Sequence, residues 1–227
     1  MDIDEAIWTR RSIRRYKPDP VPQKVLEEII ETAKWAGSGM NTQPWEFAVL
    51  GGDKMKQFKT GLLEKIKANA PDESEIPGMP AGGIPEPYNS RAAEYRTTSD
   101  KYHFPEGTEN VDQKRKDHMT RAGQSHDAPN VIIIYTDRKL MNWGSAMISF
   151  GIIAQTICLA ALKHNLGTCI LGRAVAWPNM IRELCGIPQS KVMVCAIAIG
   201  YPEKEARINN FPRTRLEQKE FVTWHGF

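Results

Sequence analysis

The sequence predicts one α+β or α/β domain in which helices flank a sheet, and three observations support this fold class. The chain has 227 residues with 41% hydrophobic side chains, which is enough to bury one sizeable core. Residues 131–135 and 192–199 are largely apolar runs, as expected of strands that are covered on both faces. Segments with helical spacing separate these strands along the chain.

In the first third of the chain, apolar spacing, proline and glycine predict four elements. Residues 3–9 are expected to form a short helix. A second helix is expected from Pro22 to about Gly37, because proline suits the first turn of a helix and glycine its end. Residues 45–50 are short, apolar and β-prone, which predicts a strand, and residues 54–68 have the spacing of a helix.

The later elements follow from the same signals. Residues 71–87 are rich in proline, glycine and acidic residues, which predicts a loop. Residues 144–165 are expected to form a long buried helix that is closed by Gly167. Residues 178–184 have a proline at their start and are followed by Gly186, which indicates a short helix.

Composition argues against several classes of protein. The 30 basic and 27 acidic side chains give a net charge of only +3, so nucleic acid is not an expected partner. Four cysteines without a CxxC pair and five scattered histidines predict no metal site and a reducing cytoplasm. No signal peptide is visible at the N-terminus. The most apolar stretch, 148–162, is shorter than the roughly 20 residues of a membrane span, so no membrane partner is expected.

Four arginines within six residues, RRSIRR at 10–15, form the first candidate site. Guanidinium groups bind phosphate oxygens in a bidentate manner, and a serine hydroxyl adds a neutral donor. The motif therefore indicates an anion site. A solvated basic turn is the alternative that the motif alone leaves open.

The second candidate site is the segment GSGMNTQPW at 37–45. Its glycines allow close backbone approach, and its amide side chains suit a flavin ring edge, which presents both donors and acceptors. A polar loop between a helix and a strand explains the segment equally well. It is no dinucleotide fingerprint, because the third glycine is missing and the segment precedes a strand.

These two motifs, together with three in the C-terminal half, resemble the FMN-dependent nitroreductase family. The motifs are RRSIRRY at 10–16, NTQPW at 41–45, LGTC at 166–169, IP at 187–188 and AIGYP at 198–202. The resemblance covers nearly the whole chain and is weakest over residues 70–127. It implies an α+β fold with a mixed sheet flanked by helices, in an intertwined homodimer that binds FMN across the subunit interface.

The resemblance also assigns roles to individual residues. It implies that Arg10, Ser12 and Arg14 hold the FMN phosphate and that Arg11 lies against the flavin or its ribityl chain. It implies that Asn41 and Gln43 reach the flavin from the other subunit. The backbone of Ile170, Leu171 and Gly172 corresponds to the cover of the ring near N5. A tail arginine, Arg215 in preference to Arg213, is expected to close on the phosphate. No catalytic side chain is implied.

The function implied is transfer of reducing equivalents from NADH or NADPH through FMN to nitroaromatic, quinone or activated-alkene acceptors. The alternatives are a flavin-binding sensor or storage protein, a basic-arm interaction protein without cofactor, and a reductive dehalogenase of the same family. The last is disfavoured, because the acid, tyrosine and lysine of the deiodinating branch do not match in spacing here. The available residues are Glu94, Tyr95, Lys101 and Tyr102.

We expect a single domain over residues 1–227, with a lid at about 71–127 and a C-terminal arm at about 203–227. Proline and glycine in the lid are expected to break regular structure and to leave it mobile. Its aromatic rings either stack on the acceptor or pack beneath the lid. These rings are Tyr88, Tyr95, Tyr102 and Phe104. The long apolar helix at 144–165 is the expected centre of the dimer interface.

Overall fold

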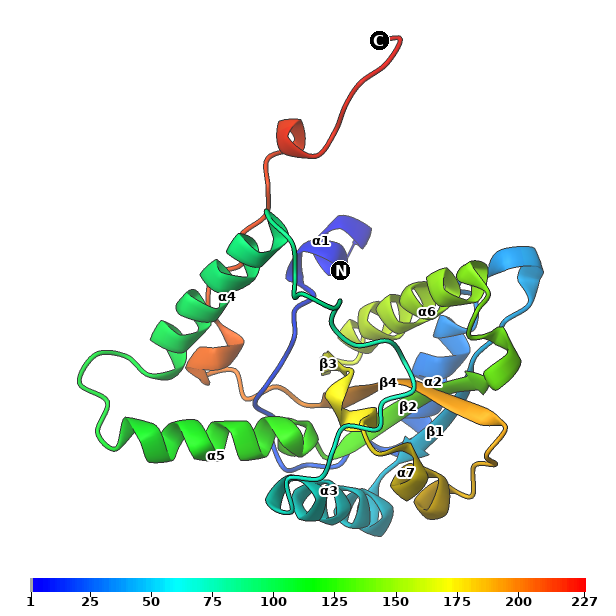
Figure 1. The fold of residues 1–227 in the computed structure, drawn as a ribbon, viewed down its shortest axis with the longest axis horizontal. Coiled ribbons are helices and arrows are strands. Elements are labelled where there is room, and N and C mark those ends of the chain that lie inside the picture. The colour runs from blue at the N-terminus through cyan, green and yellow to red at the C-terminus, as the bar shows by residue number, and fades with distance from the viewer. Residues whose placement is uncertain (1) are drawn as a thin grey trace.

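The computed structural model describes residues 2–227 and has a four-stranded sheet at its centre (Figure 1). The strands lie in the order β1, β2, β4, β3, and each neighbouring pair is antiparallel. The bounds are Glu46–Leu50 for β1, Asn130–Asp137 for β2, Gly167–Leu171 for β3 and Lys191–Gly200 for β4. Helices cover this sheet, so the α+β class is confirmed.

The expectation of a mixed sheet is wrong for these four strands. Among the residues that the structure describes, parallel pairing is limited to one isolated bridge between Ser12 and Thr168. Side-chain periodicity identifies strands but does not set their direction, which depends on where each connection returns to the sheet. Gly167 begins β3 instead of only closing a helix. A Cβ atom there would lie 2.4 Å from Cγ1 of Ile13, so this close approach requires glycine.

The central strand β2 separates two hydrophobic cores. Successive side chains of a strand point to opposite faces. Ile132 and Ile134 pack against one group of helices, and Val131 and Ile133 pack against another. All four side chains are fully buried, which confirms the prediction of a strand that is covered on both faces.

Two helices lie on each face of the sheet (Figure 1). The first face carries α2 (Gln23–Ala33) and α6 (Gly144–Leu162), and the second carries α3 (Gly52–Lys67) and α7 (Pro178–Cys185). The short α1 (Ile3–Thr9) precedes them. The predicted helices are confirmed, but α2 and α6 end three or four residues early, because their last residues continue as turns.

Helix α6 is a partly buried core helix. It is the one helix among residues 2–227 that is long and apolar enough to cross a membrane. In this fold, side chains such as Phe150, Ile153 and Ile157 are buried against the sheet and α2. Ile148 and Ile152 lie on its other side and are 68% and 40% exposed. The helix therefore has one face in the core and one apolar face outside it.

The expectation that residues 71–127 lack regular structure is wrong for much of that segment. It contains α4 (Tyr88–His103) and α5 (Val111–Gly123), which extend beyond the sheet in Figure 1. None of the residues of α4 is buried, and in α5 only Gly123 is. Helices that are polar all round have no apolar stripe, so periodicity does not identify them.

The beginning of the same segment is fixed to the second face of the sheet. Glu75 accepts two hydrogen bonds of 2.7 Å from Arg182 and lies 2.5 Å from Arg138. The indole of Trp177 donates to the carbonyl of Pro71 at 2.9 Å. Burial alone raises the pKa of Glu75, but the hydrogen bonds from both arginines and from the Met193 amide lower it overall. The segment is therefore anchored at its start and becomes polar and exposed further on.

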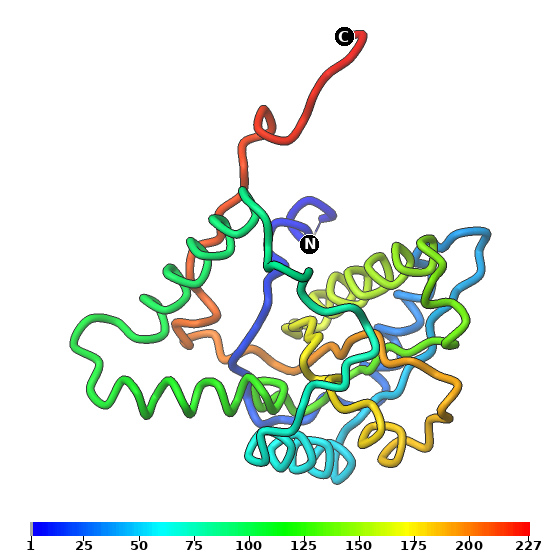
Figure 2. The backbone as a smooth tube through the Cα atoms, in the orientation of Figure 1, coloured from blue at the N-terminus to red at the C-terminus, as the bar shows by residue number. Residues whose placement is uncertain are grey.

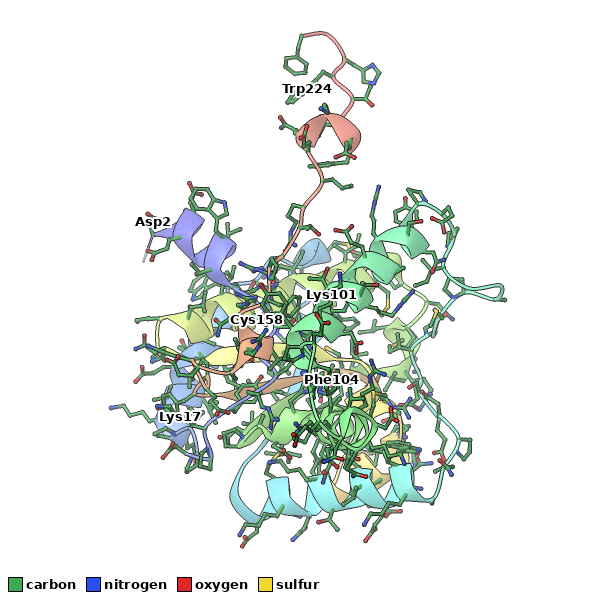
Figure 3. All side chains as sticks on the ribbon, turned by 90° about the vertical axis from the view of Figure 1, so that its left-hand side faces the viewer. Asp2, Lys17, Lys101, Phe104, Cys158 and Trp224 are labelled. Carbon is green, nitrogen blue, oxygen red and sulfur yellow. The ribbon has the colours of Figure 1, made fainter. Side chains whose placement is uncertain are left out.

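The C-terminal arm leaves the body of the protein after passing α4 (Figure 2). Its last residues extend away from the domain, and Trp224 stands clear of the body (Figure 3). The side chains of Phe221, Trp224 and Phe227 are at least 62% exposed. The arm contains, near its start, the short helical turn Arg207–Asn209, which lies beside α4.

Candidate functional site

The arginine motif runs along the free edge of β3. The Ile13 amide donates to the carbonyl of Thr168 at 2.9 Å, and Ser12 forms the isolated bridge to the same residue. Ile13 and Tyr16 are buried, and the Tyr16 hydroxyl donates to the Ile13 carbonyl at 2.8 Å. Because Ile13 points into the core, the neighbouring Ser12 and Arg14 are left facing away from it.

A buried amide side chain joins this motif to the arm. The Oδ1 atom of Asn209 accepts from the backbone amides of Arg14 at 2.8 Å and Arg15 at 3.2 Å. Its Nδ2 group donates to the carbonyls of Arg15 at 2.9 Å and Glu203 at 3.0 Å. Asn209 is 3% exposed, so these bonds satisfy a buried polar group. No local sequence pattern pairs residue 209 with residues 14 and 15, so this role of Asn209 could not be predicted.

A cavity of about 740 Å³ lies where the arginine motif, α4 and the arm meet. Its lining includes six arginines and one carboxylate. These charged residues are Arg10, Arg11, Arg14, Arg91, Arg213, Arg215 and Glu94. Ser12, Tyr95 and Phe211 also line it. The fold thus brings Arg10, Arg11, Ser12, Arg14 and Arg215 together, although about 200 residues separate the two ends.

The electrostatics of the cavity favour an anion. Burial and the nearby Arg14 lower the pKa of Arg11 below its usual value. Burial and three neighbouring arginines likewise lower the pKa of Arg213. The Nε atom of Arg11 is buried and has no hydrogen-bond partner within residues 2–227. A bound anion would offset the repulsion between these cations and accept the unpaired donors.

Two arginines of the arm, Arg213 and Arg215, are held differently. Arg213 donates to the backbone carbonyls of Trp8 and Arg10, which fastens the arm to the N-terminal segment. Within residues 2–227, Arg215 donates only to the carbonyl of the preceding residue, at 2.7 Å. Arg215 therefore keeps most of its donors for a ligand. This difference supports the sequence-based preference for Arg215 over Arg213.

Phe211 is the centre of an aromatic and cationic cluster beside the cavity. The rings of Tyr95 and Tyr102 lie 5.8 and 6.3 Å from its ring. The guanidinium groups of Arg11 and Arg14 lie 5.7 and 6.0 Å from it. Both tyrosines thus pack against an aromatic residue of the arm.

The other sequence-predicted flavin residues do not line this cavity. Asn41 and Gln43 are exposed and have positive φ angles of 53° and 45°. The backbone N–H of Gln43 donates to the hydroxyl oxygen of Ser38 at 3.0 Å. Ile170, Leu171 and Gly172 lie at the end of β3, where Ile170 is 42% exposed. Asn41 and Gln43 thus lie on the protein surface, away from the arginine-lined cavity.

Three histidines that are scattered in the sequence come together behind the arginine motif. The ring of His118 lies 3.9 Å from that of His103 and 6.5 Å from that of His126. Burial, reinforced by the positive charges of Arg14 and Arg15, lowers the pKa of His103 to about 4 and that of His126 to about 3. No group of residues within 2–227 has the arrangement of a metal site.

The chain is similar over most of its length to nitroreductases. The model of the nitroreductase family matches residues 7–201. The chain is 30% identical to the chloronitrobenzene nitroreductase of Comamonas testosteroni, covering 98% of this chain and 96% of that one. It is 28% identical to the 4-nitrobenzoate reductase of Pseudomonas putida, covering 100% and 96%. The FMN and NADPH-dependent nitroreductase NfnB from Sphigopyxis sp. strain HMH has the same fold, with a TM-score of 0.87, 23% identity and full coverage of both chains.

Proposed function

The chain belongs to the nitroreductase family, and from this premise we propose that it is an FMN-dependent oxidoreductase that uses NADH or NADPH to reduce nitroaromatic compounds. Similar proteins are named for the reduction of 4-nitrobenzoate and chloronitrobenzene. The single observation that supports the proposal most strongly is the cavity in which Arg10, Ser12, Arg14 and Arg215 converge. Quinones and activated alkenes are proposed as further acceptors, because they are also electron-poor.

The donors around the cavity fit the phosphate end of FMN. Arginine forks match phosphate oxygens in charge and geometry, and Ser12 adds a neutral hydroxyl. We assign Arg10, Ser12, Arg14 and Arg215 to the phosphate. The unpaired Nε group of Arg11 is available to the ribityl chain or the ring. These residues bind and orient the cofactor, and none of them has to transfer a proton.

FMN held by these residues would supply the redox chemistry, namely hydride transfer from the nicotinamide nucleotide and electron transfer to the acceptor. The backbone of Ile170, Leu171 and Gly172 is proposed to cover one side of the ring near N5. Asn41 and Gln43 are proposed to reach the ring from a second subunit. Helices α4 and α5 are proposed to act as a lid over the acceptor.

We also propose that the protein is a homodimer. Large apolar side chains are exposed on α1, on α6 and on the arm, and exposed apolar surface is typical of protein interfaces. Examples are Trp8 at 71%, Ile148 at 68% and Trp224 at 62% exposed. In the proposed dimer, this apolar surface is buried between the subunits, and Asn41 of one subunit is proposed to reach the flavin of the other. Sedimentation at assay concentration tests this, and an active monomer would contradict it.

The cytoplasm is the proposed location. All four cysteines are free, and burial raises the pKa of each thiol, which suits unreactive side chains in a reducing compartment.

The test of the function separates an enzyme from a flavin-binding sensor. The purified protein is loaded with FMN, mixed with NADPH or NADH without oxygen, and followed by the flavin absorbance. Bleaching within seconds, followed by recovery of the absorbance on addition of 4-nitrobenzoate or chloronitrobenzene, supports the proposal. Stable FMN binding without bleaching would indicate a sensor or storage protein, and failure to bind FMN would overturn the assignment of the cavity.

A further inference from the structure

We propose that Tyr95 of α4 belongs to the phosphate-binding site and that it couples the docking of α4 to the phosphate of the bound flavin. The inference rests on the proposed function, because the phosphate of FMN is the anion in question. It assigns a role in phosphate binding to a residue that the sequence connects with the acceptor or with packing beneath the lid. The inference rests on the position of Tyr95 beside Arg14.

The Tyr95 hydroxyl accepts a hydrogen bond of 2.8 Å from Nη2 of Arg14, and both residues line the cavity. A phenol that accepts one hydrogen bond keeps its own proton as a donor. Arg14 uses its other terminal nitrogen only weakly, toward the Ser12 carbonyl at 3.4 Å. Tyr95 can therefore hold Arg14 in place and donate to an anion beside it.

Helix α4 is attached through exposed and half-buried contacts. It buries none of its residues, so it lacks the apolar face that docks most surface helices. On the side of the arginine motif and the arm it is held by the Tyr95 hydroxyl on Arg14 and by the rings of Tyr95 and Tyr102 on Phe211. Toward α5 it is held by the Asp100–Arg115 ion pair and by the contact of the His103 and His118 rings. A segment with so few buried contacts opens at low free-energy cost.

These contacts make the phosphate a common anchor for three segments. Arg14 comes from the N-terminal motif, Tyr95 from α4 and Phe211 from the arm, and the Arg14 guanidinium lies 5.9 and 6.0 Å from the two rings. An anion that fixes Arg14 also fixes the group to which Arg14 donates. Because such coupling is reciprocal, docking of α4 strengthens phosphate binding and phosphate binding stabilises the docked helix.

The first experiment compares FMN with riboflavin, which lacks the phosphate, by fluorescence titration of the apo-protein. For Tyr95→Phe we expect the preference for FMN over riboflavin to fall roughly tenfold or more, with riboflavin affinity unchanged, as expected for loss of a hydrogen bond to a charged group. Tyr102→Phe is the matched control, since its ring packs on the same Phe211 side chain. The control should keep the preference of the unmodified protein.

Two other results would overturn the inference, and a third would overturn the proposed function. An unchanged preference in Tyr95→Phe overturns the inference. Equal loss of FMN and riboflavin affinity also overturns it, because it indicates a merely structural role. If the unmodified protein binds neither flavin, the proposed function fails, and that failure is distinct from failure of the role of Tyr95.

The second experiment measures hydrogen exchange of the α4 backbone with and without inorganic phosphate, and then with FMN. We expect both ligands to slow exchange in α4 of the unmodified protein and of Tyr102→Phe, and to have a smaller effect in Tyr95→Phe. Exchange in α4 that is insensitive to FMN in the unmodified protein would overturn the coupling.

Discussion

Two groups of arginines in this protein have opposite surroundings. In the ion-pair cluster, Arg182 and Arg138 bind Glu75, and the side chains of Arg182 and Glu75 are 5% and 13% exposed. In the cation cluster, the arginines line the cavity, and none makes an ion pair with a carboxylate of residues 2–227. The cation cluster consists of Arg10, Arg11, Arg14, Arg213 and Arg215.

The difference separates a structural role from a binding role. A buried arginine that is paired with a carboxylate keeps a loop attached to the sheet, and its charge is already balanced. Crowded arginines that lack a carboxylate raise the free energy of the protein by mutual repulsion and lower it again when an anion binds. The ion-pair cluster should therefore determine stability, and the cation cluster should determine FMN affinity.

The largest effect is expected from Glu75→Ala. It leaves Arg182 buried without its partner, so we expect a loss of roughly 3–5 kcal/mol in the free energy of unfolding. Urea unfolding measures this, and FMN affinity of the folded fraction should not change. Glu73→Ala, two residues away and exposed, is the control. A cost for Glu75→Ala below about 1 kcal/mol would be typical of a surface pair and would contradict the comparison.

Arg14→Ala tests the opposite case. We expect FMN to bind roughly 10- to 100-fold more weakly, because a charge-assisted hydrogen bond contributes about 1.5–3 kcal/mol. The free energy of unfolding without FMN should change far less than in Glu75→Ala, because the substitution also removes repulsion from Arg11. Arg96→Ala, an exposed change on α4 outside the large cavity, is the control. Unchanged FMN affinity in Arg14→Ala would exclude this cavity as the phosphate site.

Within the cation cluster, Arg213 and Arg215 should respond differently. We expect Arg215→Ala to weaken FMN binding roughly tenfold while the arm stays docked. Arg213→Ala removes the bonds to the Trp8 and Arg10 carbonyls, so it should increase hydrogen exchange and proteolysis of the arm. Loss of FMN affinity in Arg213→Ala alone would transfer the phosphate role to Arg213. No loss in either variant would remove the arm from the phosphate site.

The smallest expected effect is on how the free energy of unfolding depends on pH. This dependence should differ between the histidines beside the arginine motif and Glu75 of the ion-pair cluster. The pKa values of His103 and His126 are lowered to about 4 and about 3, so the unfolded chain binds protons first as the pH falls below about 6.5. Stability should decline from that pH downward, by about 1 kcal/mol between pH 7 and 5.5 after allowance for partial exposure. The pKa of Glu75 is lowered, so the stability that its ionised carboxylate contributes is lost only when the pH falls below the usual pKa range of a glutamate.

Urea unfolding at several pH values tests whether the loss of stability linked to the histidines occurs at a higher pH than the loss linked to Glu75. The groups that face His103 and His126 are His118, Arg14, Arg15 and, for His103, Asp100. His126→Asn should reduce the decline between pH 7 and 5.5, whereas His225→Gln on the exposed arm should not. A decline that is unchanged in His126→Asn would show that this histidine does not cause it.

Sequence patterns predicted much of the fold and part of the site. The runs at 131–135 and 192–199 are the central strands because apolar residues continue on both faces. Gly186 ends α7 with a φ of 70°, a conformation that glycine adopts without strain. Residue chemistry alone predicted an anion site at the arginine motif, and the structure places Arg10, Arg11, Ser12 and Arg14 at one cavity. By contrast, α4 and α5 were missed, because polar residues on every side leave no periodic signal.

The sequence by itself determined the chemistry of individual segments: which runs are strands, where several helices begin, and which short motif carries concentrated positive charge. Only the tertiary structure decided which distant residues meet. Glu75 pairs with Arg182 across 107 residues, and Asn209 joins Arg14 across 195. Local periodicity and capping depend on neighbours within a few residues, whereas these pairs depend on how the elements pack around the sheet. The same packing directs Arg213 to backbone carbonyls and leaves Arg215 available at the cavity.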